Sequence, residues 1–460
     1  MFQLKYGVFK FQAFVRNFAG KEFLMARGTI VLKFFISTLV VCLTVSGAVA
    51  DGLTFQRQVA KILDEHPRIA SAKHTVRSLG QGVRVAEKAW FPDLAVTGSR
   101  AYEDRNNASG TDDTQLNSND VKFTLTLPIY DFGSKQSGTK IARLQLLQAE
   151  KTLQLTKQSI ILEIGIAQIG VSTAIEKLRY AKRSLLNLKK QTKLEDIKVK
   201  AGAGVSTDVL QAKVQLAGAR ARFEASKGIL ANQEHRYRAV FGDLQNDFLK
   251  PRKIKSQIED LPETKEEALE VARKNNLQIQ SLSDAVSISR TAVSQIQSNT
   301  LWPKINFIVD NSYKKNVGGT LGVAQELVAK IQFTYNFNLG FSALNSIDAA
   351  RDNFSATQTQ LDDARRLIDE AVSNAFVAYR QAGINAELLA EQSELSGAFL
   401  ELARKERTLG KRSLIEILAG ETAEINAKSD AAEARGSIAS TSLVLLSAMG
   451  ILEARHLELE

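Results

Sequence analysis

The most extensive pattern in the chain is a series of apolar or small residues that predicts an unusually long helix. These residues recur at alternating steps of four and three: Ile160, Ile164, Ala167, Val171, Ala174, Leu178, Ala181, Leu185 and Leu188. A period of 3.5 is typical of a coiled-coil seam. No proline lies between positions 129 and 250, so residues 133–201 are predicted to form one helix about 100 Å long at 1.5 Å per residue. A glycine turn then leads into a return helix over 206–242.

The same pattern occurs a second time in the chain. A shift of 208 residues carries Gly202 onto Gly410, and it carries the first seam onto Ile368, Val372, Ala375, Tyr379, Ala382, Ala386 and Leu389. A second long helix is therefore predicted over 340–409, with its return helix over 412–449. Seam and turns that agree under one shift indicate an internal duplication, because chance heptads drift out of register.

Two other stretches alternate with a period of two and predict strands. Val121, Phe123 and Leu125 alternate with polar residues, and so do Ile331, Phe333, Tyr335 and Phe337. Weaker partners precede both stretches, which predicts one hairpin in each repeat, over 93–130 and 304–338. The polar connections 103–120 and 314–322 are interpreted as loops in water.

Strands of about ten residues match the length that spans a tilted membrane barrel wall, although a soluble sandwich with one wet face has the same alternation. In the barrel interpretation the lipid-facing positions are Val121, Phe123, Leu125, Ile331, Phe333 and Tyr335. Four strands cannot close a barrel, because open edges leave backbone groups unpaired in lipid. Several chains would have to share one barrel, and a dimer with eight strands and a trimer with twelve both remain open.

Shorter helices are predicted before each hairpin. The first runs over 53–89, bent at His66-Pro67, and its counterpart begins at residue 265. Trp90-Phe91-Pro92 and Trp302-Pro303 follow them. Aromatic residues beside a proline suit a membrane boundary, but a helix end with buried rings fits equally well. The predicted organisation is a first repeat over 51–250, a linker over 251–264, a second repeat over 265–452 and a tail over 453–460.

The first 50 residues are predicted to be a secretory signal region. Arg27 and Lys33 precede an apolar run over 34–45, and Ala48-Val49-Ala50 supplies a small-residue cleavage site. Met25 is an alternative start. The sole cysteine, Cys42, lies inside this region, so the mature chain is predicted to form no disulfide or thiolate metal site. No later apolar run is expected to reach the 18 to 20 residues of a spanning helix.

Charge and motifs argue against nucleic-acid binding and catalysis. The formal net charge is +10, but residues 1–50 hold six basic residues and one acid, which leaves 54 against 49. That balance is too small to indicate a nucleic-acid partner. The run from Gly202 to Thr207 follows a helix and is a poor phosphate loop. The histidines do not cluster, so neither cofactor nor metal is expected; Asp112-Asp113 is a conceivable calcium ligand pair, with a solvated loop favoured.

The chain resembles the TolC-like outer-membrane efflux proteins of Gram-negative bacteria. The resemblance covers residues 53–452 and rests on the duplicated order of elements and on four motifs. These are Phe91-Pro92-Asp93-Leu94, Trp302-Pro303-Lys304-Ile305, Pro128-Ile129-Tyr130-Asp131-Phe132-Gly133 and the run Gly202 to Ala212.

The resemblance implies a mainly α-helical fold with a small β part. It implies a homotrimer with a twelve-stranded outer-membrane barrel and a hollow helical cylinder that extends into the periplasm. It also implies two protein partners, a periplasmic adaptor and an inner-membrane pump, in drug efflux or type I secretion. The channel itself would do no chemistry.

The resemblance also implies a gate at the helix tips. Arg412 matches an arginine that contacts a Thr-Asp pair of a neighbouring protomer, here Thr207 and Asp208, and Glu416 matches an acidic ring at the entrance. The tip turns are formed by Gly202, Gly204 and Gly410. Two positions depart from the family pattern: Ala419 stands where a second acid is common, and Arg407 where some members have a gate tyrosine.

Two alternatives stay open. Arg412 is also compatible with a simple role at a helix end or in solvent. For the whole chain, the alternative is a periplasmic coiled-coil adaptor or structural protein without a pore, although such proteins lack two barrel hairpins with apolar faces.

Overall fold

A computed structural model describes residues 55–106, 113–242 and 260–457, all within the unit Leu53–Glu460. The predicted signal region with Met25 and Cys42, the acidic residue Asp112 and most of the predicted linker 251–264 lie outside the described residues.

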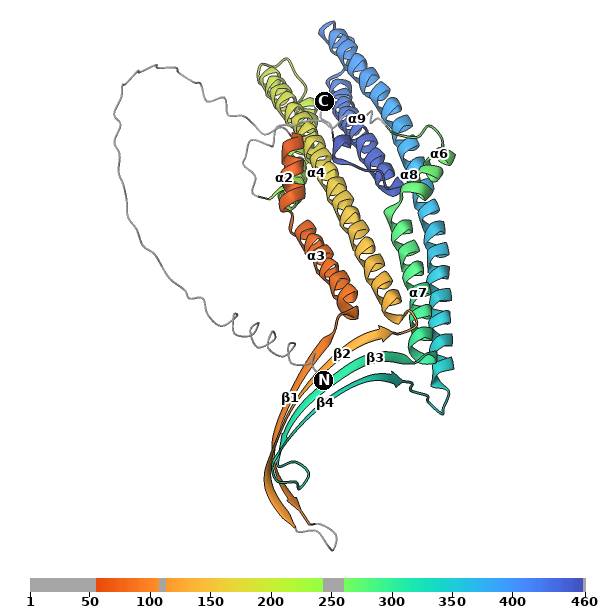
Figure 1. The fold of residues 1–460 in the computed structure, drawn as a ribbon. Helices are drawn as coiled ribbons and strands as arrows, with labels where there is room; N and C mark the ends of the chain where they lie inside the picture. Colours follow the sequence, from red (N-terminus) through yellow and green to blue (C-terminus); the bar gives the residue numbers. More distant parts are fainter. Residues whose placement is uncertain (1–54, 107–112, 243–259, 458–460) are drawn as a thin grey trace, which may run out of the picture. The chain divides into compact units, whose positions relative to one another are not determined.

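Four long helices dominate the described chain (Figure 1). The helices α4 (Ser134–Lys200) and α8 (Ser342–Thr408) have 67 residues each. The helices α5 (Ser206–Phe241) and α9 (Leu414–Met449) have 36 residues each. A shift of 208 residues carries both ends of α4 onto those of α8, and both ends of α5 onto those of α9. The predicted fold class, mainly helical with a small sheet, is confirmed.

Shorter helices lie beside the long ones. They are α2 (Phe55–Glu65), α3 (Pro67–Glu87), α6 (Lys265–Asn275) and α7 (Leu277–Leu301), with single 3₁₀ turns at Lys88–Trp90 and Ala454–His456. The break between α2 and α3 falls at His66, which has extended backbone geometry before Pro67 and whose side chain accepts a hydrogen bond from the amide of Arg68. Asn276 has the same role before α7. Each break is therefore a capped helix start.

Both tip turns end a long helix with the same backbone motif. The amides of Gly202 and Ala203 donate to the carbonyls of Val199 and Lys198, each at 3.0 Å. The amides of Gly410 and Lys411 donate in the same pattern to Arg407 and Glu406. Gly202 and Gly410 have φ values of 76° and 74°. This is the Schellman ending, which needs the left-handed conformation that glycine adopts without strain.

The main core lies midway along the helical part, where the short helices pack on the long ones. Its fully buried members include Ile69, Ile160, Ile164, Leu443 and Leu446. A smaller cluster near the tips joins the two helical hairpins through Leu188, Leu216 and Leu418. The seam predicted from the sequence is thus the face along which α4 packs.

The close approach at the end of α9 makes a testable prediction. Gly450 has φ of 78°, and a Cβ there would lie 2.8 Å from the Cα of Asn276. Gly450→Ala is expected to destabilise the protein by about 2 kcal/mol or more, because it adds left-handed strain and a backbone clash. Thermal unfolding followed by helical circular dichroism would measure this. Gly228→Ala in α5, where nothing lies within 4 Å, is the matched control, and an equal effect of both variants would contradict the prediction.

The four strands form one antiparallel sheet in the order β1-β2-β3-β4 (Figure 1). They are β1 (Asp93–Arg105), β2 (Thr114–Tyr130), β3 (Lys304–Lys315) and β4 (Val323–Thr334). The central pair, β2 with β3, joins the two predicted hairpins into one sheet. Within the described residues β1 and β4 are the edge strands.

Two sequence predictions about the strands were wrong. Tyr335 and Phe337 lie beyond β4, which ends at Thr334, because its partner β3 begins only at Lys304 after Pro303 and offers nothing for later residues to pair with. The predicted loop 103–120 also contains strand: β1 continues to Arg105, and β2 begins at Thr114. Polar side chains support that extension, since the Gln115 amide donates to Asp104 at 3.3 Å.

One further expectation needs correction. The α4 helix contains an 18-residue window with a mean hydropathy of 1.4, long and apolar enough to span a membrane by composition alone. Half of that window is buried within the protein, and Ile160, Ile164 and Val171 belong to the main core. Burial against neighbouring helices accounts for its apolar character.

Candidate functional site

The sheet separates apolar from polar side chains onto opposite faces. Directly paired residues share a face, and so do residues two apart along a strand. The register pairs Leu94 with Leu125, Val96 with Phe123, Val121 with Tyr313, Leu125 with Val309, Phe307 with Ile331 and Ile305 with Phe333. The predicted lipid-facing positions within the strands, Val121, Phe123, Leu125, Ile331 and Phe333, therefore lie on one face. Tyr335 lies outside the strand.

The opposite face carries hydroxyl, amide and charged groups. Thr124 pairs with Asp310, Lys122 with Ser312 and Asn306 with Gln332 in the register. A sheet with one apolar and one polar face suits a wall between lipid and water.

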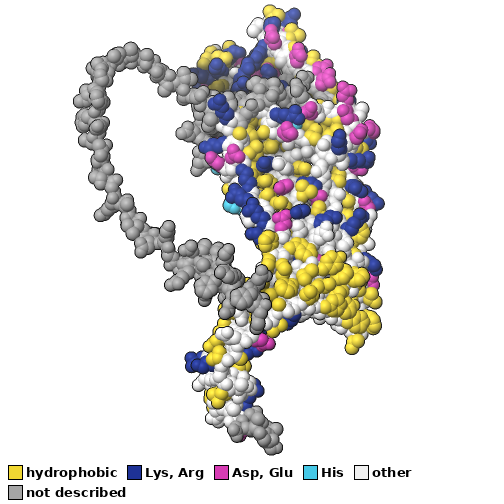
Figure 2. Space-filling view, viewed as in Figure 1, with side chains coloured by type: hydrophobic (Ala, Val, Ile, Leu, Met, Phe, Trp, Pro, Cys, Tyr) yellow, Lys and Arg dark blue, Asp and Glu magenta, His cyan; other side chains and the backbone are white. Residues whose placement is uncertain are grey.

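Aromatic side chains gather where the strands meet the helices, and they are exposed on the chain. Figure 2 shows a patch of hydrophobic side chains at this junction. Phe91 and Trp302 are 69% and 51% exposed, and Trp302 stacks on Phe132 with ring centroids 4.8 Å apart. These exposures disfavour the alternative of rings buried at helix ends. They agree with an amphipathic belt at a membrane boundary.

The proposed gate residues lie at the opposite end of the helices. Thr207 is exposed, and Asp208 lies in the first turn of α5, where a carboxylate favours the helix N-terminus. Gly202, Gly204 and Gly410 lie in the two tip turns. A Cβ on Gly204 would approach Val199 to 2.9 Å. The turn therefore requires a residue without a side chain.

Arg412 pairs within its own hairpin in this single chain. Its Nε lies 2.6 Å from Glu406 Oε2, and its Nη1 lies 3.9 Å from Glu416 Oε2. The hydrogen bond to Glu406 raises the pKa of Arg412 above its ordinary value. The guanidinium also lies 5.3 Å from the centre of the Phe399 ring. These contacts hold Arg412 at the tip, and its predicted contact with Thr207 and Asp208 of a neighbouring protomer remains a prediction.

Glu416 has a structural role that the sequence pattern did not reveal. It is the third residue of α9 and forms a capping box with Ser413. Its carboxylate accepts from the amide of Ser413 at 3.3 Å, and its own amide donates to the Ser413 hydroxyl at 3.4 Å. The assignment of Glu416 to an entrance ring stays a prediction.

The most buried ion pair near the tips involves a residue that the sequence pattern did not single out. Arg407 of α8 donates to Glu195 of α4 at 2.6 Å, with side-chain exposures of 24% and 9%. We call Glu195 and Arg407 the tip ion pair. It joins the two helical hairpins within one chain. Arg407 is one of the positions that depart from the family pattern, and Glu195 is its partner here.

A second charged contact lies nearby. Arg404 of α8 donates to Glu421 of α9 at 2.6 Å, and the Glu421 side chain is 4% exposed. Gln191 of α4 also donates to Glu421. This carboxylate thus links three helices.

The burial of Glu195 could have been predicted from the apolar seam of the first long helix. Continued past Leu188 with the same alternation, it passes through Thr192 and Glu195, both of which are buried. An ionisable residue at a seam position requires a partner, because an unpaired buried charge is costly. The predicted seam, which stopped at Leu188, was too short.

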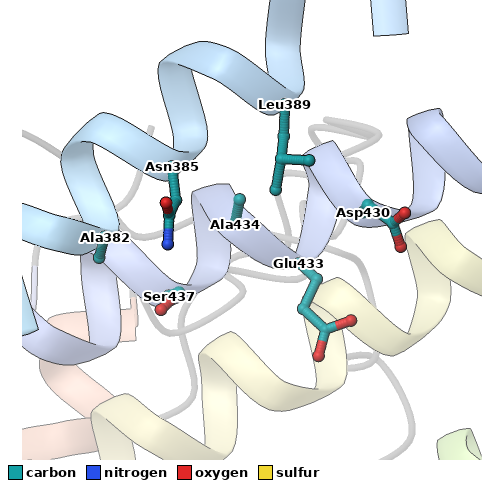
Figure 3. A pocket seen from close by; sticks show the side chains of 7 residues that line it. All are labelled: Ala382, Asn385, Leu389, Asp430, Glu433, Ala434 and Ser437. Atoms are coloured by element: carbon teal, nitrogen blue, oxygen red, sulfur yellow. The ribbon is translucent and has the colours of Figure 1, made fainter. Parts of the chain in front are cut away.

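A groove of about 330 Å³ lies between α8 and α9 (Figure 3). Its lining residues are Ala382, Asn385, Leu389, Asp430, Glu433, Ala434 and Ser437. Glu433 forms an ion pair with Lys177 of α4, with 2.7 Å between Oε2 and Nζ. This ion pair links α9 to α4. Within the described residues no group of three or more His, Cys, Asp or Glu side chains is placed to hold a metal ion.

The structure defines a class of protein in which a small sheet with one apolar and one polar face continues into long paired helices. The family model described as "Outer membrane efflux protein" matches residues 59–243 and 268–451. The chain therefore belongs to the outer membrane efflux protein family, and the family's name places it in the outer membrane.

Individual relatives agree with that membership. Outer membrane protein TolC of Escherichia coli is 24% identical over 402 residues, which cover 82% of this chain and 78% of the relative. Outer membrane efflux protein BepC of Brucella suis is 21% identical over 418 residues, covering 90% and 89%. Among solved structures, the open state of the Neisseria gonorrhoeae MtrE outer membrane channel has a TM-score of 0.73 at 17% identity, covering 86% and 88%.

Proposed function

We propose that three copies of this chain form an outer-membrane exit channel with a gated periplasmic end. The observation that carries the proposal is the four-stranded sheet, which has one apolar face and two edge strands, β1 and β4. Such a sheet is unsatisfied in lipid unless its edges pair. Pairing β4 of one copy with β1 of the next closes a barrel, and three copies supply twelve strands.

The helices supply the second part of the channel. At 1.5 Å per residue, the 67 residues of α4 or α8 extend about 100 Å. Attached to a barrel wall, a ring of such helices would carry the lumen into the periplasm. The main core is shared by these helices and the shorter ones. This shared packing supports a rigid tube and not a set of flexibly linked helices.

The tips would form the gate and the docking site. The tip ion pair holds the hairpins of each protomer together, and the proposed contact of Arg412 with Thr207 and Asp208 would join neighbouring protomers. The tips also carry exposed apolar side chains, at Val205, Leu210, Leu409 and Ile415. Exposed apolar groups of this kind mark a protein interface, which supports docking of a periplasmic adaptor that connects to an inner-membrane pump.

The channel would move its cargo without chemistry of its own. Either small drugs or secreted polypeptides fit a polar tunnel, and both efflux and type I secretion remain within the proposal. The alternative, a periplasmic adaptor without a pore, does not explain why the sheet has an apolar outer face.

Planar-bilayer recording of the purified protein tests the proposal. Discrete conductance steps from a folded trimer are expected, and no conductance from such a trimer would contradict it. Trimer migration that changes on heating, together with fractionation into the outer membrane, would separate the channel from the adaptor alternative.

Replacing Arg412 tests its part in the gate. Arg412→Ala is expected to raise single-channel conductance modestly, because a partly exposed arginine pair contributes at most about 1 kcal/mol in each protomer. Conductance recorded in the same bilayers checks this, with Arg351→Ala as the control, since Arg351 pairs with Asp348 near the other end of α8. Unchanged conductance would remove Arg412 from the gate.

A further inference from the structure

The polar face of the sheet carries a cluster of three charged side chains at mid-height. Lys122 is the middle residue of β2 (Thr114–Tyr130). Asp310 and Lys330 lie near the middle of β3 and β4. The register places all three on the face opposite Phe123 and Phe333. They form a row across three neighbouring strands.

The three side chains are in direct contact. Lys122 Nζ lies 3.1 Å from Asp310 Oδ1, and Lys330 Nζ lies 3.6 Å from Asp310 Oδ2. The hydroxyl of Thr124 also donates to Asp310 Oδ1 at 2.8 Å. One carboxylate is therefore shared by two ammonium groups, and this row carries an excess of one positive charge.

Exposure decides which charge meets a passing solute. The side chains of Lys122 and Lys330 are 43% and 46% exposed, whereas that of Asp310 is 14% exposed. The ammonium groups project into solvent and the carboxylate lies close to the wall. A field near this face is therefore positive at short range.

Neighbouring charges do not cancel this arrangement. Farther along the sheet, Lys314 lies 3.6 Å from Glu326. Asp120 is the nearest other carboxylate on β2; it pairs with Lys314 in the register, and one of its oxygens is buried. Thr97, opposite Lys122 on β1, is uncharged. Glu326 is 59% exposed, but its charge is balanced by Lys314, so the unbalanced charge near mid-height is the one that Lys122 and Lys330 carry in excess of Asp310.

We propose that Lys122 and Lys330 make the barrel lumen select for anionic solutes at mid-height. This inference rests on the proposed trimeric channel, in which the polar face lines the lumen. Three chains would place six ammonium groups around one ring, and rings of lysine or arginine favour anions in pores. The effect is strongest at low salt, where the screening length is about 10 Å.

A cysteine probe measures the local potential without depending on the tip gate. Val328 lies opposite Asp310 on the polar face and is 36% exposed. Val328→Cys is introduced together with Cys42→Ala, which removes the chain's own cysteine. Outer membranes from cells expressing the full chain are then treated with an anionic and a cationic methanethiosulfonate reagent, and the ratio of the two modification rates is measured.

The expected result is a preference for the anionic reagent that depends on the lysines. Lys122→Gln with Lys330→Gln is expected to lower the anion-to-cation rate ratio about threefold or more at 0.1 M salt. Asp310→Asn is expected to raise the ratio. Lys315→Gln, at the end of β3 outside the row, is the matched control and should leave it unchanged.

Two results would overturn the inference. A ratio that is the same with and without the lysines means that they do not set the potential. The inference also fails if the ratio measured with Lys122, Asp310 and Lys330 unchanged stays constant between 0.1 M and 1 M salt. This measurement needs no lysine variant. Failure of the proposed function looks different: the thiol introduced by Leu327→Cys, on the apolar face, would react with both reagents as readily as the thiol introduced by Val328→Cys, because neither face would then lie in lipid.

Discussion

Conductance of the trimer is expected to increase more in Arg407→Ala than in Arg412→Ala. Loss of Arg407 leaves Glu195, at 9% exposure, without its 2.6 Å partner, although Lys198 still lies 3.1 Å from the same carboxylate. Removing one partner of a buried pair costs about 3 kcal/mol or more, and the remaining lysine reduces this to about 2 kcal/mol. Since the pair joins α4 to α8, its loss weakens the contact between the two hairpins in every protomer, although the apolar cluster of Leu188, Leu216 and Leu418 still joins them.

Single-channel recording checks this prediction, and charge exchange gives it a specific control. Glu195→Arg combined with Arg407→Glu is expected to restore the low conductance that either single change raises. Lys405→Ala, two residues from Arg407 in a pair with Glu401 in which both side chains are at least 70% exposed, should behave like the unchanged protein. Equal conductance in Arg407→Ala and the unchanged protein would exclude the tip ion pair from gating.

Assembly is expected to fail when an arginine is placed on the apolar face of the sheet. Leu125→Arg should cost about 2 to 4 kcal/mol near the bilayer midplane, and Phe333→Arg, one residue from the end of β4, should cost less. The yield of folded trimer in the outer membrane measures the effect. The physical reason is that a guanidinium in hydrocarbon loses its hydration without gaining a partner.

The neighbouring residue provides the control for this test. Gln332→Arg places the same side chain on the polar face, one residue from Phe333, and is expected to assemble normally. If Gln332→Arg fails and Phe333→Arg assembles, the faces have been assigned the wrong way round.

Much of this fold could be predicted because long periodic patterns are strong signals. The seam from Ile160 to Leu188 and its copy identified helices whose ends agree within about two residues with the structure. The strand ends were harder, because pairing depends on the partner strand. Phe337 continues the alternation of β4, but beyond the start of β3 it has no strand to pair with.

The candidate site was predicted less completely than the fold. Turn glycines are visible in a sequence because only a few residue types tolerate their backbone geometry. Ion pairs between distant segments are not visible in this way: Glu195 and Arg407 are separated by 212 residues, and many charged residues lie on each long helix. Only the position of Glu195 on the buried seam distinguishes it.

The equal bounds of the two helical hairpins have a consequence for the symmetry of the proposed trimer. Six hairpins of one length would surround its axis, which approximates sixfold symmetry in the backbone. The side chains break that symmetry at the tips, because the shift of 208 residues carries Thr192 and Glu195 onto Leu400 and Ala403, all of which are buried. The contact between the two hairpins of each protomer therefore contains an ion pair at a position where the second repeat has only apolar side chains. Adaptor binding that breaks this pair would then act on three of the six junctions between hairpins, and the pore would open with threefold symmetry.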